Sequence, residues 1–315
     1  MNTILTNEIS NPFSQVSDTN SYAKAFGDRN SIVHFSAREM EPSNRWSLLS
    51  IHCAFDGNEY YKVKNCTYRI SNSKYLVLNE GSQRASFISS IDRVESLSVS
   101  FSPQFVIGYL SSLFGTNSEL LDDPFYTSPH TFLFNEQLYD YDESISLQLT
   151  NLRTLINNLN QNKEHVDDAV CTLFESLLCK QKDIWQEIRK IPCSKMSTKK
   201  ELYERLTRAK DYVFSCYKEN ISVNDLANLT CLNKDYFSRE FKRVFGLRPL
   251  EYIQHMRLSE GKRLLKTTDK TTNEICYEVG YSDPSSFCKL FKRRFNCYPQ
   301  EYLKSTVLKE ELTLI

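Results

Sequence analysis

The sequence predicts an α+β protein built from two different domains. Its 315 residues, 40% of them hydrophobic, are enough for two separate cores. Short β-like stretches fill residues 31–103, amphipathic helical patterns follow, and a helix-turn-helix unit occurs twice near the C-terminus. We therefore expect an N-terminal antiparallel β-domain with helices and a C-terminal all-α domain, in which two helix-turn-helix motifs are joined by a long helix.

The first part of the chain is expected to form a polar arm and then the strands. Residues 1–30 are rich in Asn, Ser and Thr and show little periodicity, which predicts a flexible arm. The domain that follows is expected to cover residues 31–191. Turn segments such as DGN and NEGSQ separate its candidate strands, which are WSLLSIHCAF, TYRI, KYLVLN, ASFI and VESLSVSF. That spacing is typical of an antiparallel sandwich or a small barrel.

Three helical segments are expected after the strands, at about 105–115, 142–160 and 163–191. In the third, apolar residues recur at i, i+3, i+4 spacing and form a stripe that includes Val166, Val170, Leu173, Leu177 and Ile184. The stripe is longer than one small β-domain needs to cover itself, so it predicts a dimer face. The alternative is that it packs on its own β-domain.

Residues 192–197 are expected to link this domain to the second, 198–304, which is followed by a tail at 305–315. The second domain contains the internal repeat. Eight residues of the first copy recur 50 positions later, namely Phe237, Phe241, Lys242, Arg243, Phe245, Pro249, Glu251 and Tyr252. Upstream pairs such as Leu226 and Ile275 lie 49 apart, so the second copy has one extra residue in its turn.

Each copy has the pattern of a short helix, a turn and a second helix with a basic outer face. The second helices are predicted near 233–245 and 284–295, with Asn233 and Asp283 as N-caps. A phenylalanine stripe faces the core in both helices. Polar and basic side chains are left on the opposite face, where they can reach base edges in a major groove. A long helix from Pro249 to about Lys266 joins the two copies.

The net charge of zero hides a split between the two halves. Residues 1–196 carry 17 Lys and Arg against 23 Asp and Glu, a balance of −6, whereas residues 197–315 carry 22 against 16, a balance of +6. The positive half contains the repeat, which predicts contact with phosphates. Chance asymmetry is the alternative.

Three stretches carry a resemblance to a known family: DLANLTCLNKDYFSREFKRVFG, EYIQHMRLSEGKRLLKTTD and EICYEVGYSDPSSFCKLFKRRFNCYPQEY. They resemble the DNA-binding domain of the AraC/XylS family of bacterial transcriptional regulators over about residues 200–304. The departures are small, namely Gly261 and Cys276 where the family usually has Ala, and Asn296 where it usually has Gly. The resemblance implies a sequence-specific DNA-binding regulator that reads two successive major grooves.

The resemblance assigns base-reading roles to three residues on each second helix, which are Asp235, Ser238, Arg239, Ser285, Cys288 and Lys289. Arg239 is the strongest candidate, because Arg can pair with guanine in bidentate fashion. Neighbouring basic side chains are expected to contact phosphates; they are Lys234, Lys242, Lys292, Arg293 and Arg294. For any one of them the alternative is a solvated surface charge.

The N-terminal region resembles the cupin-like sensor domains of that family in general layout, which implies effector sensing, dimerisation or both. A competing hypothesis is a metal-dependent cupin-type enzyme fused to a DNA-binding tail. It requires a His-x-His motif with a following Glu and His, whereas the five histidines are scattered at His34, His52, His130, His165 and His255. We therefore expect a protein that is not an enzyme, with no metal and no cofactor.

The expected partners are double-stranded DNA, RNA polymerase, a second copy of the chain in a homodimer and a small-molecule effector. No apolar run approaches the roughly 18–20 residues needed to cross a bilayer, and the start of the chain lacks the pattern of a signal peptide. A cytoplasmic regulator without a membrane partner is expected, and the family favours an activator.

The ten cysteines contain no CxxC pair and are expected to be reduced. Cys288 leaves two hypotheses open. It packs or contacts a base as a small apolar group, or Lys289 and Lys292 favour its thiolate and make it redox-sensitive.

Overall fold

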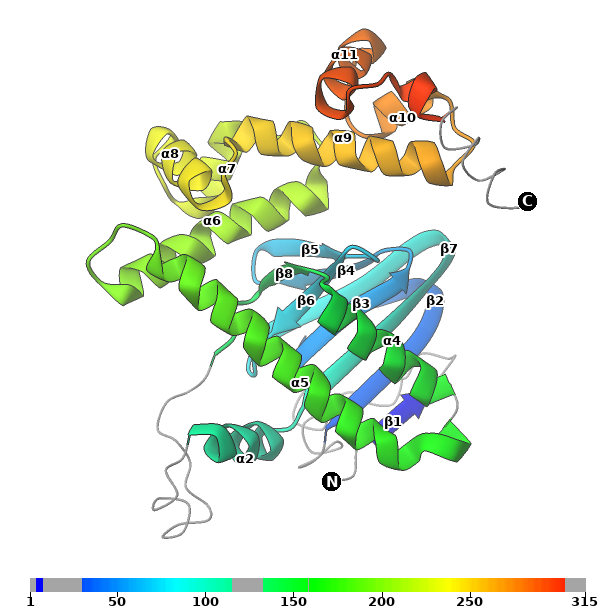
Figure 1. Ribbon diagram of the computed structural model, residues 1–315, viewed down its shortest axis with the longest axis vertical. Coiled ribbons are helices and arrows are strands. Elements are labelled where there is room, and N and C mark those ends of the chain that lie inside the picture. The colour runs from blue at the N-terminus through cyan, green and yellow to red at the C-terminus, as the bar shows by residue number, and fades with distance from the viewer. Residues whose placement is uncertain (1–3, 8–29, 115–132, 158, 304–315) are drawn as a thin grey trace. The chain divides into compact units, whose positions relative to one another are not determined.

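The computed structural model describes residues 4–7, 30–114, 133–157 and 159–303. It divides into two compact units, Met1–Lys199 and Lys200–Ile315 (Figure 1). The described strands all lie in the first unit and the second is helical, which confirms the expected α+β class. Within the described ranges, no helix combines the length and the apolar character that a membrane span requires.

The first unit is built on one eight-stranded sheet with the main order β1-β2-β7-β3-β6-β8, to which β4 and β5 are added beside β7. The strands are β1 (Ile4–Asn7), β2 (Ser31–Trp46), β3 (Leu49–Asp56), β4 (Glu59–Val63), β5 (Cys66–Ile70), β6 (Lys74–Leu78), β7 (Gln83–Phe101) and β8 (Gln137–Asp140). The pairs are antiparallel except for β1, which runs parallel to β2.

Strand β7 organises the sheet because it has different neighbours along its length. It pairs with β2 almost from end to end, with β4 near its start and with β3 near its end. Since β3 and β4 both flank the same long strand, the sheet curves and side chains from β3 and β4 meet: the hydroxyl of Tyr61 lies 3.1 Å from Nδ1 of His52.

Two details of this region differ from the expectation. Residues 85–88 and 94–101 are expected to be separate strands, but both belong to β7. The polar stretch between them, residues 90–93, lies opposite the single residue Arg38 of β2, and the pairing with β2 continues on either side of this irregularity. Part of the expected arm, Ile4–Asn7, forms β1, since its residues favour strands and the edge of β2 offers unpaired backbone groups. Most of the arm, the tail and His130 lie outside the described residues.

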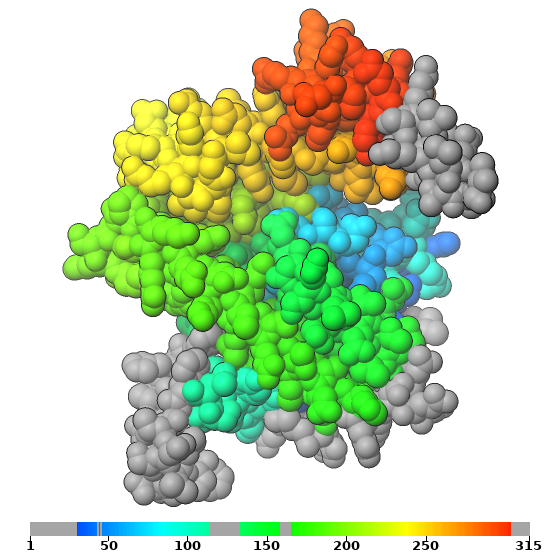
Figure 2. Space-filling model, in the orientation of Figure 1, coloured from blue at the N-terminus to red at the C-terminus, as the bar shows by residue number. Residues whose placement is uncertain are grey.

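Among the described residues of this unit there are three helices: α2 (Pro103–Phe114), α4 (Glu143–Asn157) and α5 (Leu159–Arg189). Helices α4 and α5 run side by side over one face of the sheet (Figures 1 and 2). Phe174 of α5 joins the layers, with its ring centroid 5.1 Å from that of Phe101 on β7 and 5.2 Å from that of Phe105 on α2.

The structure contradicts the dimer face expected on α5. Its five residues are at most 5% exposed within a single chain: Val166, Val170, Leu173, Leu177 and Ile184. The 31-residue helix α5 contacts the sheet, α2 and α4, so the long stripe is used inside the unit. Packing on its own β-domain, the alternative for this stripe, is what the structure has.

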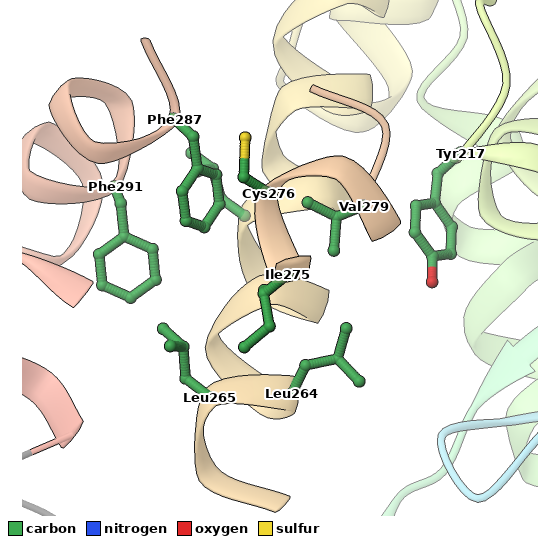
Figure 3. Close-up of a cluster of buried hydrophobic side chains, with 9 residues drawn as sticks. Tyr217, Leu264, Leu265, Ile275, Cys276, Val279, Phe287 and Phe291 are labelled. Carbon is green, nitrogen blue, oxygen red and sulfur yellow. The ribbon is translucent and has the colours of Figure 1, made fainter. Parts of the chain in front are cut away.

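The described part of the second unit contains two long helices and four short ones. They are α6 (Met196–Cys216), α7 (Val223–Thr230), α8 (Lys234–Phe245), α9 (Pro249–Thr267), α10 (Thr272–Glu278) and α11 (Pro284–Phe295). Helix α6 begins at Met196, before the expected domain start at 198. Helix α9 joins the two motifs and contributes Leu258 to the core of the second. It also contributes Leu264 and Leu265, which point toward Ile275 of α10 (Figure 3).

The departure at Gly261 has a packing reason. A Cβ at this position would lie 3.1 Å from the ring of Phe287, closer than ordinary van der Waals contact. The glycine therefore allows α9 and α11 to approach each other closely, and α9 keeps its helical hydrogen bonds through this point.

Candidate nucleic-acid interface

The first helix-turn-helix motif is fixed by capping interactions at each end of its turn. Ser222 and Asp225 form a capping box at the start of α7, which ends at Cys231 with a left-handed φ of 53°. Asn233 then caps α8 by accepting a hydrogen bond from the backbone N–H of Asp235 at 2.9 Å. Local sequence therefore determines where the second helix begins.

The second motif uses equivalent devices with one more residue. Thr271 and Glu274 form the capping box of α10, and the left-handed turn residue is Gly280, with φ of 91°. Two residues separate Gly280 from the N-cap Asp283, whereas one separates Cys231 from Asn233, which places the extra residue in the turn. Any Cβ at Gly280 would lie 2.7 Å from the carbonyl oxygen of Lys218, so this turn requires glycine.

Both second helices are held by the same set of aromatic contacts. In the first motif, the ring centroid of Phe241 lies 5.4 Å from Phe237, 4.8 Å from Phe245 and 5.7 Å from Tyr252. In the second, the corresponding distances from Phe291 are 5.7, 4.6 and 6.2 Å, to Phe287, Phe295 and Tyr302. The repeat in the sequence is thus a repeat in packing, and α8 and α11 present matching faces.

The helix ends match as well. Gly246 and Asn296 end the two helices with φ of 79° and 61°, and each donates its backbone N–H to the carbonyl four residues earlier at 2.8 Å. Asn tolerates the left-handed conformation better than most residues with a Cβ. The replacement of glycine at position 296 therefore leaves the geometry of the cap unchanged.

Most of the expected DNA-contacting side chains lie on the outer faces of these helices. On α8 and α11 the exposed members are Lys234, Asp235, Arg239, Lys242, Ser285, Lys289, Lys292, Arg293 and Arg294, and Ser238 is half-buried. Lysine and arginine predominate among them, which gives both faces the charge that phosphates attract. Arg294 lies toward the side of α9, where burial and the charge of Arg294 lower the pKa of His255.

Sequence reasoning missed Glu240. This carboxylate is buried on α8 and lies 2.7 Å from Nη1 of Arg243 and 3.2 Å from Nε of Arg239. Arg239 also stacks near Tyr236, with its guanidinium carbon 5.3 Å from the ring centroid. The available signal in the sequence was a single glutamate between two arginines in a predominantly basic helix. A buried acid needs charged or hydrogen-bonding partners close by, and the arginines supply them.

The second motif lacks this carboxylate. Leu290 occupies the position that corresponds to Glu240, and Lys289 and Arg293 correspond to the two arginines. Lys292 instead lies over the ring of Tyr298, 4.1 Å from its centroid. The first reading helix therefore holds Arg239 with a fixed partner, whereas the second presents its cations without an acid on the same helix.

Cys288 does not lie on the outer face. It is half-buried against the core of the second motif, beside Phe287 and Phe291. Burial, and to a lesser extent the charge of Asp283, raise the pKa of its thiol, so the thiolate is disfavoured and the redox hypothesis loses its basis. Position 288 lies seven residues, or about two helical turns, before Phe295 and therefore on the same side of the helix as the phenylalanine stripe. The base-reading role expected for Cys288 requires the opposite side.

No metal-binding cluster emerges from the described residues: no three of their His, Cys, Asp and Glu side chains gather as ligands would. None of the ten cysteines forms a disulfide bond. His52 is a buried structural residue, with Nε2 2.9 Å from the hydroxyl of Ser50 and Nδ1 2.8 Å from that of Ser98.

Comparison with known proteins agrees with this geometry. Residues 226–305 match the model of a helix-turn-helix domain family. The uncharacterized HTH-type transcriptional regulator YisR of Bacillus subtilis (strain 168) is 36% identical over 134 residues, 42% of each chain. The lactose operon transcription activator of Staphylococcus xylosus is 30% identical over 99 residues, 31% of this chain and 36% of that protein. The chain thus spans less than half the length of these curated relatives.

Among solved structures, the DNA-binding domain of AdpA in complex with a target DNA is 23% identical and covers 33% of this chain and 95% of its own, with a TM-score of 0.33.

Proposed function

We propose that this chain, whose residues 226–305 match a helix-turn-helix domain of the AraC type, is a sequence-specific DNA-binding regulator of transcription. The family resemblance drawn from the sequence holds for this domain. The observation that carries the proposal is the repeated packing of α8 and α11, which presents two basic helices in the same way. Each helix enters a major groove, and successive grooves on one side of DNA are about 34 Å apart.

The proposal divides the outer faces into reading and anchoring groups. Asp235, Ser238 and Arg239 on α8, and Ser285 and Lys289 on α11, contact base edges. Lys234, Lys242, Lys292, Arg293 and Arg294 contact phosphates and set the position of the helices on the duplex. Cys288, half-buried, contributes at most an apolar contact at the edge of the second helix.

Selection of bound sequences from a randomised DNA pool with the full-length protein tests this function. A motif with two conserved segments one helical turn apart is expected, because two helices read successive grooves. Binding without any enriched sequence would contradict the reading function. A selected DNA motif with a single conserved segment would show that only one of the two helices recognises a base sequence.

The proposal extends to the whole protein as an activator. The relative from Staphylococcus xylosus is named a transcription activator, and an activator of this kind contacts RNA polymerase when bound beside a promoter. Its site of action is the cytoplasm, where the DNA lies. Transcription from a promoter carrying the selected site should rise when the protein is added to purified polymerase; a fall would make it a repressor.

The N-terminal unit is proposed to sense a small molecule, to dimerise, or both. Sedimentation at micromolar concentration tests the homodimer, and a monomer would remove it from the proposal. No observation favours the competing hypothesis of a metal-dependent enzyme. The relatives reported above that are named for a function are named as regulators of transcription.

A further inference from the structure

One face of the curved sheet is polar although it is buried. Alternate residues of β7, Ser96, Ser98 and Ser100, pair across the ladder with Ala54, His52 and Ser50 of β3, so these side chains share a face. The residues between them, Leu97, Val99 and Phe101, point to the opposite face, where Phe101 meets α5. We call the polar side the inner face and define it by Ser50, His52, Glu59, Tyr61, Arg84, Ser96 and Ser98.

Part of the inner face is fully hydrogen-bonded. A chain of hydroxyl and imidazole groups runs from Ser47 to Ser50 at 2.8 Å, from Ser50 to His52 at 2.9 Å and from His52 to Ser98 at 2.8 Å. The hydroxyl of Tyr61 reaches the same histidine. Both ring nitrogens of His52 are therefore occupied, and this part of the face is structural.

Glu59 beside this network has no such partner. It begins β4, is 1% exposed, and both of its carboxyl oxygens are shielded from solvent without a hydrogen-bond partner. The hydroxyls of Ser96, Tyr61 and Ser86 lie near it, but none of them makes a hydrogen bond of ordinary geometry to either carboxyl oxygen, and the hydroxyl of Ser96 is itself unpaired. A buried carboxyl with no partner is costly, which calls for a group that supplies one.

Arg84 presents the opposite charge on the same face. It pairs in register with Val63, two residues from Tyr61, and its guanidinium carbon lies 5.5 Å from the centroid of the Tyr61 ring. Arg84 is 7% exposed and its Nε has no partner. Within the described part of the chain, no ion pair joins Arg84 to Glu59 or to another acid. The charge of Arg84 lowers the pKa of Glu59, but burial outweighs it, so the two groups are not paired directly.

We propose that the inner face binds a small zwitterionic molecule of the amino-acid type, with its ammonium group on Glu59 and its carboxylate on Arg84. The inference rests on the proposed sensing function of this unit and gives its ligand a chemical class. A simple cation would leave Arg84 unpaired, a simple anion would leave Glu59 unpaired, and a neutral polyol would neutralise neither charge. A zwitterion satisfies both, and Ser96 supplies a further hydrogen bond.

Thermal unfolding of the full-length protein tests the proposal. Both tryptophans, Trp46 and Trp185, lie in the first unit, so their fluorescence reports unfolding of that unit. The probes are the L-amino acids, each with its methyl ester and its N-acetyl derivative, and a set of neutral pentoses and hexoses. At about 100 times its Kd, the matching amino acid should raise the midpoint by about 5–10 °C. Its ester and N-acetyl derivatives, which lack one charge, should not.

Variants assign the effect to the inner face. Glu59→Gln and Arg84→Gln should each lose the shift, while Glu39→Gln and Arg38→Gln, exposed on β2, should keep it. Ser96→Ala retains both charges and should weaken binding by roughly 2–10-fold, which keeps the test decisive if a charge variant does not fold.

Three results would overturn the proposal: no amino acid shifts the midpoint, a neutral sugar shifts it equally, or the charge variants bind as the wild type does. DNA binding by the same protein is measured in parallel. A protein that binds DNA but no zwitterion loses this inference alone, whereas loss of DNA binding removes the proposed function.

Discussion

The carboxylate of Glu240 accepts a hydrogen bond from Nη1 of Arg243 at 2.7 Å, and the same carboxylate lies 3.2 Å from Nε of Arg239. Glu240 is buried, while the side chain of Arg239 is 61% exposed. One buried acid thus orients two cations of α8. Charge-assisted hydrogen bonds of this kind restrict the arginine rotamers, so Arg239 meets a base with less loss of side-chain entropy.

Replacing Glu240 by Gln should therefore change specificity more than affinity. We expect the base preference at the position read by Arg239 to broaden, and the protein to lose about 1–3 kcal/mol of stability, because hydrogen bonds to charged groups contribute that much. Sequencing of bound DNA and chemical unfolding measure the two effects. Glu204→Gln, on the exposed surface of α6, is the matched control. A Glu240→Gln protein with the wild-type motif would show that the acid has only a structural role.

Arg239→Ala and Lys292→Ala should affect DNA binding in different ways. Loss of a bidentate contact costs about 1–3 kcal/mol at one base pair, so Arg239→Ala should flatten the preference there. Lys292, which lies over Tyr298, is a phosphate candidate, and its loss should weaken all sequences about equally. Binding to a randomised pool, quantified base by base, separates the two patterns. If the Arg239→Ala protein selects the full motif, the assignment of Arg239 is wrong.

Binding should depend steeply on salt. Each neutralised phosphate contributes a slope of about −0.9 in a plot of log affinity against log salt, so five phosphate contacts give a slope of about −4 to −5. The double variant Lys242→Ala and Lys292→Ala should reduce the magnitude of the slope by about 2. Affinity that depends on phosphate contacts falls strongly between about 50 and 200 mM salt. An affinity that stays constant over this range would contradict the proposed phosphate contacts.

The rates at which Cys231 and Cys288 react with a thiol reagent should differ, because one side chain is exposed and the other is half-buried. Cys231 is exposed at the end of α7, whereas Cys288 is half-buried and the pKa of its thiol is raised by burial and by Asp283. Iodoacetamide should therefore modify Cys231 well before Cys288, since only the thiolate reacts. Mass spectrometry of peptides taken during the reaction gives the order. Equal rates would mean that Cys288 is open to solvent and would restore it to the outer face.

The part of the fold predicted best from the sequence is the part whose signals are local. The caps Asn233 and Asp283, the left-handed residues Gly246 and Asn296, and the phenylalanine stripe fix α8 and α11 without reference to distant residues. The positions of the charged outer faces could be predicted as well, because on an amphipathic helix the side opposite the buried stripe faces solvent.

The errors arose where tertiary packing decides. The stripe of α5 looks the same whether a second chain or its own sheet covers it, and only the contacts of Phe174 show which. Glu240 and Glu59 are both acids in sequence, but burial gives them roles that no local pattern reveals. Cys288 lies at the border between the buried and the exposed face of α11, where the burial of a side chain depends on the residues packed around it.

Glu59 predicts a pH dependence of stability in the unliganded protein. Burial raises the pKa of its carboxyl from 4.5 to about 7, so the folded state holds this proton more tightly than the unfolded chain. The resulting stabilisation is complete below pH 4.5 and is lost as pH rises to about 7, a change of about 3 kcal/mol.

Three neighbours on the inner face influence the test. The charge of Arg84 opposes the rise in the Glu59 pKa, and Tyr61 stays protonated in this pH range because its pKa is raised. Burial lowers the pKa of His52, so the contribution of His52 to stability decreases as the pH falls. The free energy of unfolding in urea should therefore be compared between wild type and Glu59→Gln at each pH, with tryptophan fluorescence as the signal. The wild type should lose about 3 kcal/mol relative to the variant between pH 4.5 and 7. A constant difference would show that Glu59 ionises in the fold as readily as in the unfolded chain.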